Sequence, residues 1–265
     1  MLKKIIIIVS WVVLIAGLVV LLSFVEEKHN QMNCGKVDLL IQYSEADYLI
    51  TVDDVFHFLK TKGIKIKDIK IKDVNVGNIE SILYQIPYIE KADVFMTIEG
   101  NVGIKIVQKK PLIKVFNQFH QSFYIDDKGK VMPISPDYSA RVIVANGYIE
   151  NMYHKNLCLA DDFVNGKDSI IKKSSLYKVY KIAQFIQKNE FWSAMTEEIF
   201  VNKNKEIELY TKIGDHAILF GDINQMNEKF EKLYAFYKQV LNKTGWEQYK
   251  VINLKFKNQI VCSKI

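Results

Sequence analysis

Arginine is nearly absent from this chain. Of its 36 basic residues only Arg141 is an arginine, although the formal net charge is +6. Recognition of phosphates and base edges relies on the planar guanidinium fork, which ammonium groups replace poorly. The lysines are also spread along the chain and interleaved with acidic residues. The composition therefore argues against a nucleic-acid-binding protein and indicates an ordinary solvated surface.

Cysteine is also scarce. Cys34, Cys158 and Cys262 lie far apart, with no C-x-x-C pair and no histidine at metal-ligand spacing. An oxidising compartment would permit one disulfide, but a structural framework needs more cysteines at regular spacings. We therefore expect no disulfide, no metal site and no cofactor.

Groups of catalytic side chains are missing as well. The five histidines have no partner at metal-ligand spacing. Asp126 and Asp127 are adjacent in a turn sequence, where aspartate is favoured because it bonds to the backbone. The sequence also lacks a nucleophile elbow, a glycine-rich phosphate loop and an EF-hand loop. We predict that the protein is not an enzyme.

The longest apolar stretch runs from Ile5 to Val25. About 21 residues at 1.5 Å per residue suffice to cross a ~30 Å hydrocarbon core. A cleaved signal peptide is the alternative, but its apolar region is usually ~7–15 residues long and precedes a small-residue cleavage site. The segment Ser23-Phe24-Val25-Glu26 offers no such site, so we predict an uncleaved transmembrane helix. Its apolar surface includes Ile5, Trp11, Leu14, Leu18, Leu21 and Val25.

The flanks of this stretch predict its orientation. Lys3 and Lys4 precede it, and the bias of basic residues favours a cytoplasmic N-terminus. Residues 1–4 would then be a cytoplasmic tail, residues 26–36 a polar linker, and the rest would lie outside the cytoplasm. Those ~240 residues, in a chain that is 49% hydrophobic and 12% aromatic, suit two folded domains.

Residues 37–110 follow the order strand, helix, helix, strand, strand. Val37–Tyr43 has strand character, Thr51 and Asn75 are expected to cap two helices, and Ala92–Ile98 and Val102–Gln108 are extended. Two helices packed on one face of a small sheet form a complete α+β module. We predict such a module for these residues.

A turn pattern follows this module. After the break at Pro111, Leu112–Phe116 is extended, and two apolar segments flank the loop Asp126-Asp127-Lys128-Gly129. Together with Pro87, this order resembles the FtsQ/DivIB family of bacterial cell-division proteins. Their polypeptide-transport-associated (POTRA) domain closes with "P-x-I…A-x-V…I-x-I-x-x-x-x-P" and continues into "Y-I-D-x-x-G". The resemblance covers about residues 37 to 133 and implies a POTRA domain over residues 37–110.

Residues 111–265 are predicted to form a mostly antiparallel β domain with two helices. The membrane-distal domain of the family has a similar alternation of strands and helices. Because the module before it is also α+β, the predicted fold class of the chain is α+β. The main predicted elements are strand 141–145, helix Lys172–Lys188, hairpin Glu197–Tyr210, strand Ala217–Phe220, helix Asn224–Asn242, and strands Lys250–Phe256 and Gln259–Cys262.

The resemblance implies a non-enzymatic scaffold of the divisome. Such a protein, anchored in the bacterial cytoplasmic membrane at the septum, recruits FtsB-like and FtsL-like coiled-coil membrane proteins for septal peptidoglycan assembly, with most of its chain periplasmic. The alternative is a membrane-anchored cell-envelope enzyme or an outer-membrane assembly factor with a POTRA-like module. An enzyme would need a catalytic grouping, and a barrel-assembly factor would need many more strands after the module.

The resemblance also implies that the last strand accepts a partner strand, beside a basic–aromatic pair. That pair is Lys255-Phe256 here, with lysine for the usual arginine, phenylalanine for tyrosine, and no tryptophan near the end. The alternation of Ile252, Leu254 and Phe256 would instead bury Phe256, so the pattern leaves its role open. The predicted partner-binding residues are Lys255, Phe256, Asn258, Gln259, Ile260, Val261 and Cys262.

Overall fold

A computed structural model describes residues 10–23, 33–43, 48–67, 69–160 and 169–265. The chain divides into two compact units. The first comprises Met1–Ser44 and Ile50–Gln108, and the second comprises Glu45–Leu49 and Lys109–Ile265.

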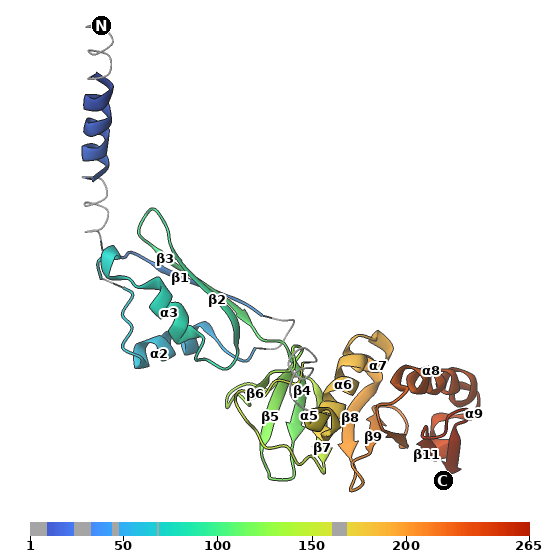
Figure 1. Ribbon diagram of the computed structural model, residues 1–265. Helices are drawn as coiled ribbons and strands as arrows, with labels where there is room; N and C mark the ends of the chain where they lie inside the picture. The colour runs from blue at the N-terminus through green and yellow to red at the C-terminus, as the bar shows by residue number, and fades with distance from the viewer. Residues whose placement is uncertain (1–9, 24–32, 44–47, 68, 161–168) are drawn as a thin grey trace. The chain divides into compact units, whose positions relative to one another are not determined.

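The first unit places two helices on one face of a small sheet (Figure 1). Among its described residues, three strands form a sheet in the order β1-β3-β2, with β1 parallel and β2 antiparallel to β3. This is the predicted strand, helix, helix, strand, strand order, with one additional 3-10 turn. The elements are β1 (Val37–Gln42), α2 (Val52–Thr61), η1 (Ile71–Asp73), α3 (Val76–Leu83), β2 (Ile89–Met96) and β3 (Val102–Gln108).

Local sequence signals begin both helices of this unit. Thr51 caps α2 as predicted: its side chain accepts a hydrogen bond from the Asp54 N–H, and the Asp54 carboxylate accepts one from the Thr51 N–H, which completes a capping box. Asn75 caps α3 in the predicted way. Val52, Val55, Phe56 and Leu59 follow helical spacing on α2, but only Val55 and Leu59 are buried, whereas Val52 and Phe56 are each 37% exposed. A sheet of three strands covers only a narrow line of the helix.

The second unit is built on one mixed sheet. Within its described residues, nine strands lie in the order β12-β11-β10-β9-β8-β7-β4-β5-β6. The pairs β4–β7, β7–β8 and β10–β11 are parallel and the other five are antiparallel. The strands are β4 (Pro111–Phe116), β5 (Ser122–Asp126), β6 (Val131–Pro133), β7 (Ile143–Gly147), β8 (Thr196–Val201), β9 (Ile207–Thr211), β10 (Ala217–Gly221), β11 (Tyr249–Asn253) and β12 (Val261–Lys264).

The expectation of two helices in this unit is wrong. The predicted helix 172–188 is divided because the Ser174 hydroxyl accepts a hydrogen bond from the Tyr177 N–H, and Asn189 caps a further short helix in the same way. The predicted helix 224–242 begins at Met226, passes through a π-helical turn and continues into a short helix that ends at Thr244. The helices are α5 (Ser169–Lys173), α6 (Ser175–Gln187), α7 (Glu190–Met195), α8 (Met226–Phe236), the π-helical η2 (Tyr237–Leu241), α9 (Asn242–Thr244) and the 3-10 helix η3 (Trp246–Gln248).

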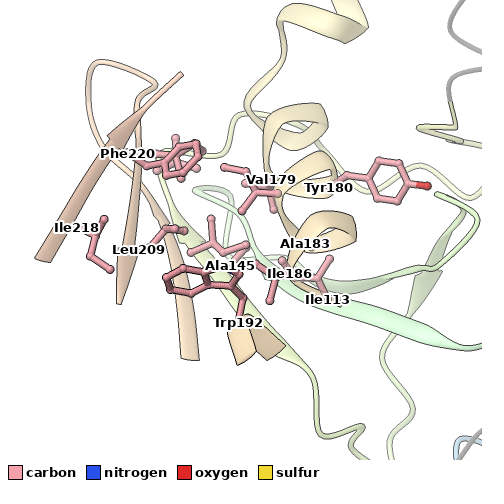
Figure 2. Packing of buried hydrophobic residues seen from close by; sticks show 14 of the residues in the cluster. Ile113, Ala145, Val179, Tyr180, Ala183, Ile186, Trp192, Leu209, Ile218 and Phe220 are labelled. Carbon is pink, nitrogen blue, oxygen red and sulfur yellow. The ribbon is translucent and has the colours of Figure 1, made fainter. Parts of the chain in front are cut away.

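The core of the second unit lies between α6 and the sheet. Figure 2 shows Val179, Ala183 and Ile186 of α6 directed toward the strands, with Trp192 of α7 beside them. All four side chains are buried. Tyr180 extends to the other side of the helix, where its hydroxyl donates to the Asp127 carbonyl at 3.3 Å. One helix thus anchors the sheet through one face and the β5–β6 turn through the other.

Candidate functional site

The C-terminal strand β12 forms one edge of the nine-stranded sheet. It pairs with β11 from Tyr249↔Lys264 to Asn253↔Val261, and no other described strand lies beside it. Val261, Ser263 and Lys264 are exposed, and Cys262 is half-buried against the core. The outer backbone groups of such an edge can pair with the strand of another chain.

The strand boundaries differ from those predicted. The predicted last strand Gln259–Cys262 is displaced by two residues, because β12 runs over Val261–Lys264. The preceding strand ends at Asn253 instead of Phe256, since the Asn253 side chain accepts a hydrogen bond from the Lys255 N–H at 3.0 Å. A loop over residues 254–260 therefore joins β11 to β12, where the predicted strands are separated by only Lys257 and Asn258.

A lysine of α8 holds this loop. The Lys232 ammonium donates to the carbonyl oxygens of Phe256 at 2.9 Å and Lys257 at 3.0 Å. These charge-assisted bonds give two loop carbonyls a fixed partner. The loop that leads into β12 is therefore held by α8 as well as by β11.

Lys255 forms an ion pair within its own chain. Its ammonium lies 3.0 and 3.1 Å from the two carboxylate oxygens of Glu206. This hydrogen bond lowers the pKa of Glu206. The lysine stem passes over Gly221, where an added Cβ would lie 3.0 Å from the Lys255 Cγ. An acidic residue of a partner protein could pair with Lys255 only beside the Glu206 carboxylate or in its place.

The remaining predicted residues lie on or beside the loop. Phe256 is 45% exposed, so its side chain does not join the core as the alternation suggested. Asn258 and Gln259 are exposed, while Ile260 is half-buried and packs against the core. Phe256 and Val261 thus present apolar surface beside the open strand edge.

Two titratable side chains named or counted in the sequence analysis, Asp126 and His216, are buried and make contacts that stabilise the fold. The Asp126 carboxylate accepts hydrogen bonds from the N–H groups of Lys128 and Lys130 at 3.0 and 2.8 Å, and burial raises its pKa to about 6. The buried His216 lies 2.8 Å from the Tyr237 hydroxyl, and burial lowers its pKa. Among the described residues no group of acidic, histidine and cysteine side chains could hold a metal ion. The three cysteines are free thiols.

Residues 10–23 are helical and their side chains are exposed. Trp11, Leu14, Leu18 and Leu21 are each more than half exposed. Ile5 and Val25, at the ends of the predicted anchor, lie outside the described residues. In the part of the chain that the structure describes, no helix combines the length and apolar character needed to cross a membrane.

Comparison with known families gives two matches. The family described as "FtsQ/DivIB, C-terminal related" matches residues 110–263, which is more than half of the chain. The chain belongs to the FtsQ/DivIB family. A POTRA-like domain matches residues 32–107 of this FtsQ/DivIB protein, which confirms the POTRA prediction for the first unit. No curated protein matches the chain at a significant level.

Family membership indicates a role in cell division, and members are generally non-enzymatic division scaffolds with divisome partners. Sequence reasoning missed Glu206, Gly221 and Lys232, which fix the region around the open edge. These residues lie far from Lys255 along the chain, and no spacing links them. Strand pairing brings Glu206 and Gly221 to Lys255, and the position of α8 brings Lys232 to the loop.

Proposed function

We propose that this FtsQ/DivIB protein is a non-enzymatic divisome scaffold that captures its partner by strand addition at β12. The supporting observation is the strand edge at β12, which has no described strand on its outer side, together with the exposed side chains of Phe256 and Val261. The partners are FtsB-like and FtsL-like coiled-coil membrane proteins that act in septal peptidoglycan assembly. Main-chain bonds to β12 provide affinity, and side chains such as Phe256 provide specificity.

Proline substitutions test strand addition. Neighbouring residues of an edge strand direct their N–H groups to opposite sides, so Cys262→Pro and Ser263→Pro remove different donors. One variant should lose a bond to β11 and unfold at a lower temperature. The other should keep its melting temperature and recover much less of the coiled-coil proteins on purification from solubilised membranes. If both variants recovered as much of the coiled-coil proteins as the parent protein does, the partner would not bind at β12.

Two side-chain variants refine the interface. Phe256→Ala removes exposed apolar surface, and Lys255→Glu places two carboxylates next to each other, so both should reduce partner recovery. Glu206→Gln is the matched control, because it releases the Lys255 ammonium without reversing its charge. If Lys255 pairs with an acidic partner residue, Glu206→Gln should leave partner recovery unchanged or increase it. A loss of recovery in Glu206→Gln equal to that in Lys255→Glu would assign Lys255 a purely internal role.

We also propose that residues 5–25 anchor the protein in the cytoplasmic membrane, with the N-terminus cytoplasmic and the bulk of the chain periplasmic. The exposure of large apolar side chains along helical residues 10–23 supports this, since such a surface is unfavourable in water. A reporter that is active only outside the cytoplasm, fused after Ile265, should be active. Mass spectrometry should find an intact N-terminus, and a mature chain beginning after residue 25 would refute the anchor.

A further inference from the structure

Aromatic side chains of α6, α7 and α8 line a groove of about 380 Å³ in the second unit. Trp192 and Phe230 are its most buried members, at 3% and 1% exposure. Phe185, Phe191 and Tyr234 are half-buried. This volume is at the lower end of small-ligand sites, so it suits one side chain and not a helix or a lipid.

The rings of the groove support one another. Phe185 stacks on Phe230 with ring centroids 4.3 Å apart. Phe191 meets Trp192 and Tyr234 edge to face, each with ring centroids 4.9 Å apart. Interlocked rings of this kind have little rotamer freedom left to lose when a ligand binds. The groove is therefore pre-organised.

The polar lining is sparse and carries one sign of charge. Besides the five rings, the groove is lined by Asn189, Asn227 and Glu231, of which only Glu231 is charged. The oxygen of the Asn189 side chain already caps α7. Aromatic rings have negatively charged faces, and the Glu231 carboxylate adds negative charge at their margin. The site is electrostatically complementary to a cation.

Ammonium groups of this chain lie near rings of the same aromatic cluster, although Lys229 is held by hydrogen bonds to the Phe220 and Asp222 carbonyls and to the Asp222 carboxylate. The Lys238 nitrogen lies 4.6 Å from the Tyr234 ring centroid, and the Lys229 nitrogen lies 5.0 Å from the Phe220 ring centroid. A guanidinium group is the better occupant of an open groove because it is planar, weakly hydrated and stacks on aromatic faces. We propose that this groove binds an arginine side chain presented by a partner protein, independently of strand addition at β12.

The test uses the full-length protein in detergent micelles, labelled with 5-fluorotryptophan. The chain has three tryptophans, so Trp11, Trp192 and Trp246 each give a fluorine NMR resonance. The resonance that is missing in a Trp192→Phe variant is that of Trp192 in the groove. The probe is the blocked tripeptide Gly-Arg-Gly, and its control replaces arginine with the uncharged isostere citrulline. The arginine peptide should shift the Trp192 resonance saturably, with a dissociation constant of roughly millimolar size. The citrulline peptide should leave it in place.

A pair of variants on α8 makes the test specific. Glu231→Gln should weaken binding of the arginine peptide roughly threefold or more, because it removes the only charge lining the groove. Glu228→Gln removes a charge from the same helix outside the groove and should leave binding unchanged. Equal shifts with both peptides, no saturable shift, or equal affinity in Glu231→Gln and the parent protein would overturn the proposal.

Discussion

The two edge strands of the nine-stranded sheet differ in how they are covered. At one edge β6 is short, reaches Pro133, and is covered by the segment 157–159, whose Leu157 carbonyl accepts a hydrogen bond from the Val131 N–H. At the other edge Val261, Ser263 and Lys264 of β12 are exposed, and no described strand pairs with its outer side. An uncovered strand edge invites pairing with other chains, and proteins usually blunt it. The contrast favours β12 as the edge used for a partner.

The covering of β6 should be far more important for stability than the exposed surface of β12. Leu159 is 1% exposed and packs in the core, so Leu159→Ala should lower the free energy of unfolding by about 2–5 kcal/mol. Val261 is 42% exposed, so Val261→Ala should change it by less than about 0.5 kcal/mol. Chemical denaturation of both variants measures the difference. Similar values would mean that β12 is covered in the protein.

The turn before β6 provides the next largest effect. Asp126→Ala removes the acceptor of two backbone N–H groups and should cost about 1–3 kcal/mol in the free energy of unfolding. Asp126→Asn keeps an oxygen acceptor, so it should retain most of the stability at neutral pH. Because the folded-state pKa of about 6 exceeds the usual 3.8, the parent protein gains stability from this group as pH falls from 6 toward 4. Asp126→Asn should lose this gain, which denaturation at several pH values would detect.

The other half of the sheet should respond to acid in the opposite direction. His216 precedes β10, and burial lowers its pKa below the usual 6.5, so the unfolded chain binds the proton more strongly. Stability contributed by neutral His216 is therefore lost as pH falls below about 6.5, the usual pKa of histidine. Hydrogen exchange between pH 7.5 and 5, expressed as protection factors, should show β10 and β11 weakening relative to β5 and β6. If the protection factors of β10 and β11 fell with pH in a His216→Gln variant as they do in the parent protein, another group would be responsible for the loss.

The ion pair near β12 should have the smallest effect. The Lys255 and Glu206 side chains are 40% and 35% exposed, and solvent screens such pairs. Glu206→Gln should therefore lower the free energy of unfolding by only about 0–1 kcal/mol. The lowered pKa of Glu206 makes this contribution present at neutral pH and absent at strongly acidic pH. Faster hydrogen exchange in residues 254–260, with unchanged global stability, is the expected signature. A global loss above about 2 kcal/mol would contradict a screened, local role.

The sequence by itself determined the elements that are specified by neighbouring residues. The capping signals at Thr51 and Asn75, and the alternation that ends at Gln108, predicted the first unit because caps, turns and two-residue periodicity act over a few residues. The turn after Asp126 was predicted for the same reason. The cap at Ser174 was a local signal too, but it was concealed inside the apolar periodicity of the predicted helix Lys172–Lys188, and the short helix that Asn189 caps was not predicted.

Only the tertiary structure decided the properties of the open edge. The sequence alternation directed Phe256 inward and extended its strand, whereas Asn253 ends the strand and Phe256 is exposed. Lys255 meets Glu206 across 49 residues of chain, and the groove rings come from three helices. Such contacts depend on which strands and helices become neighbours, and a single sequence carries no local signal of that choice.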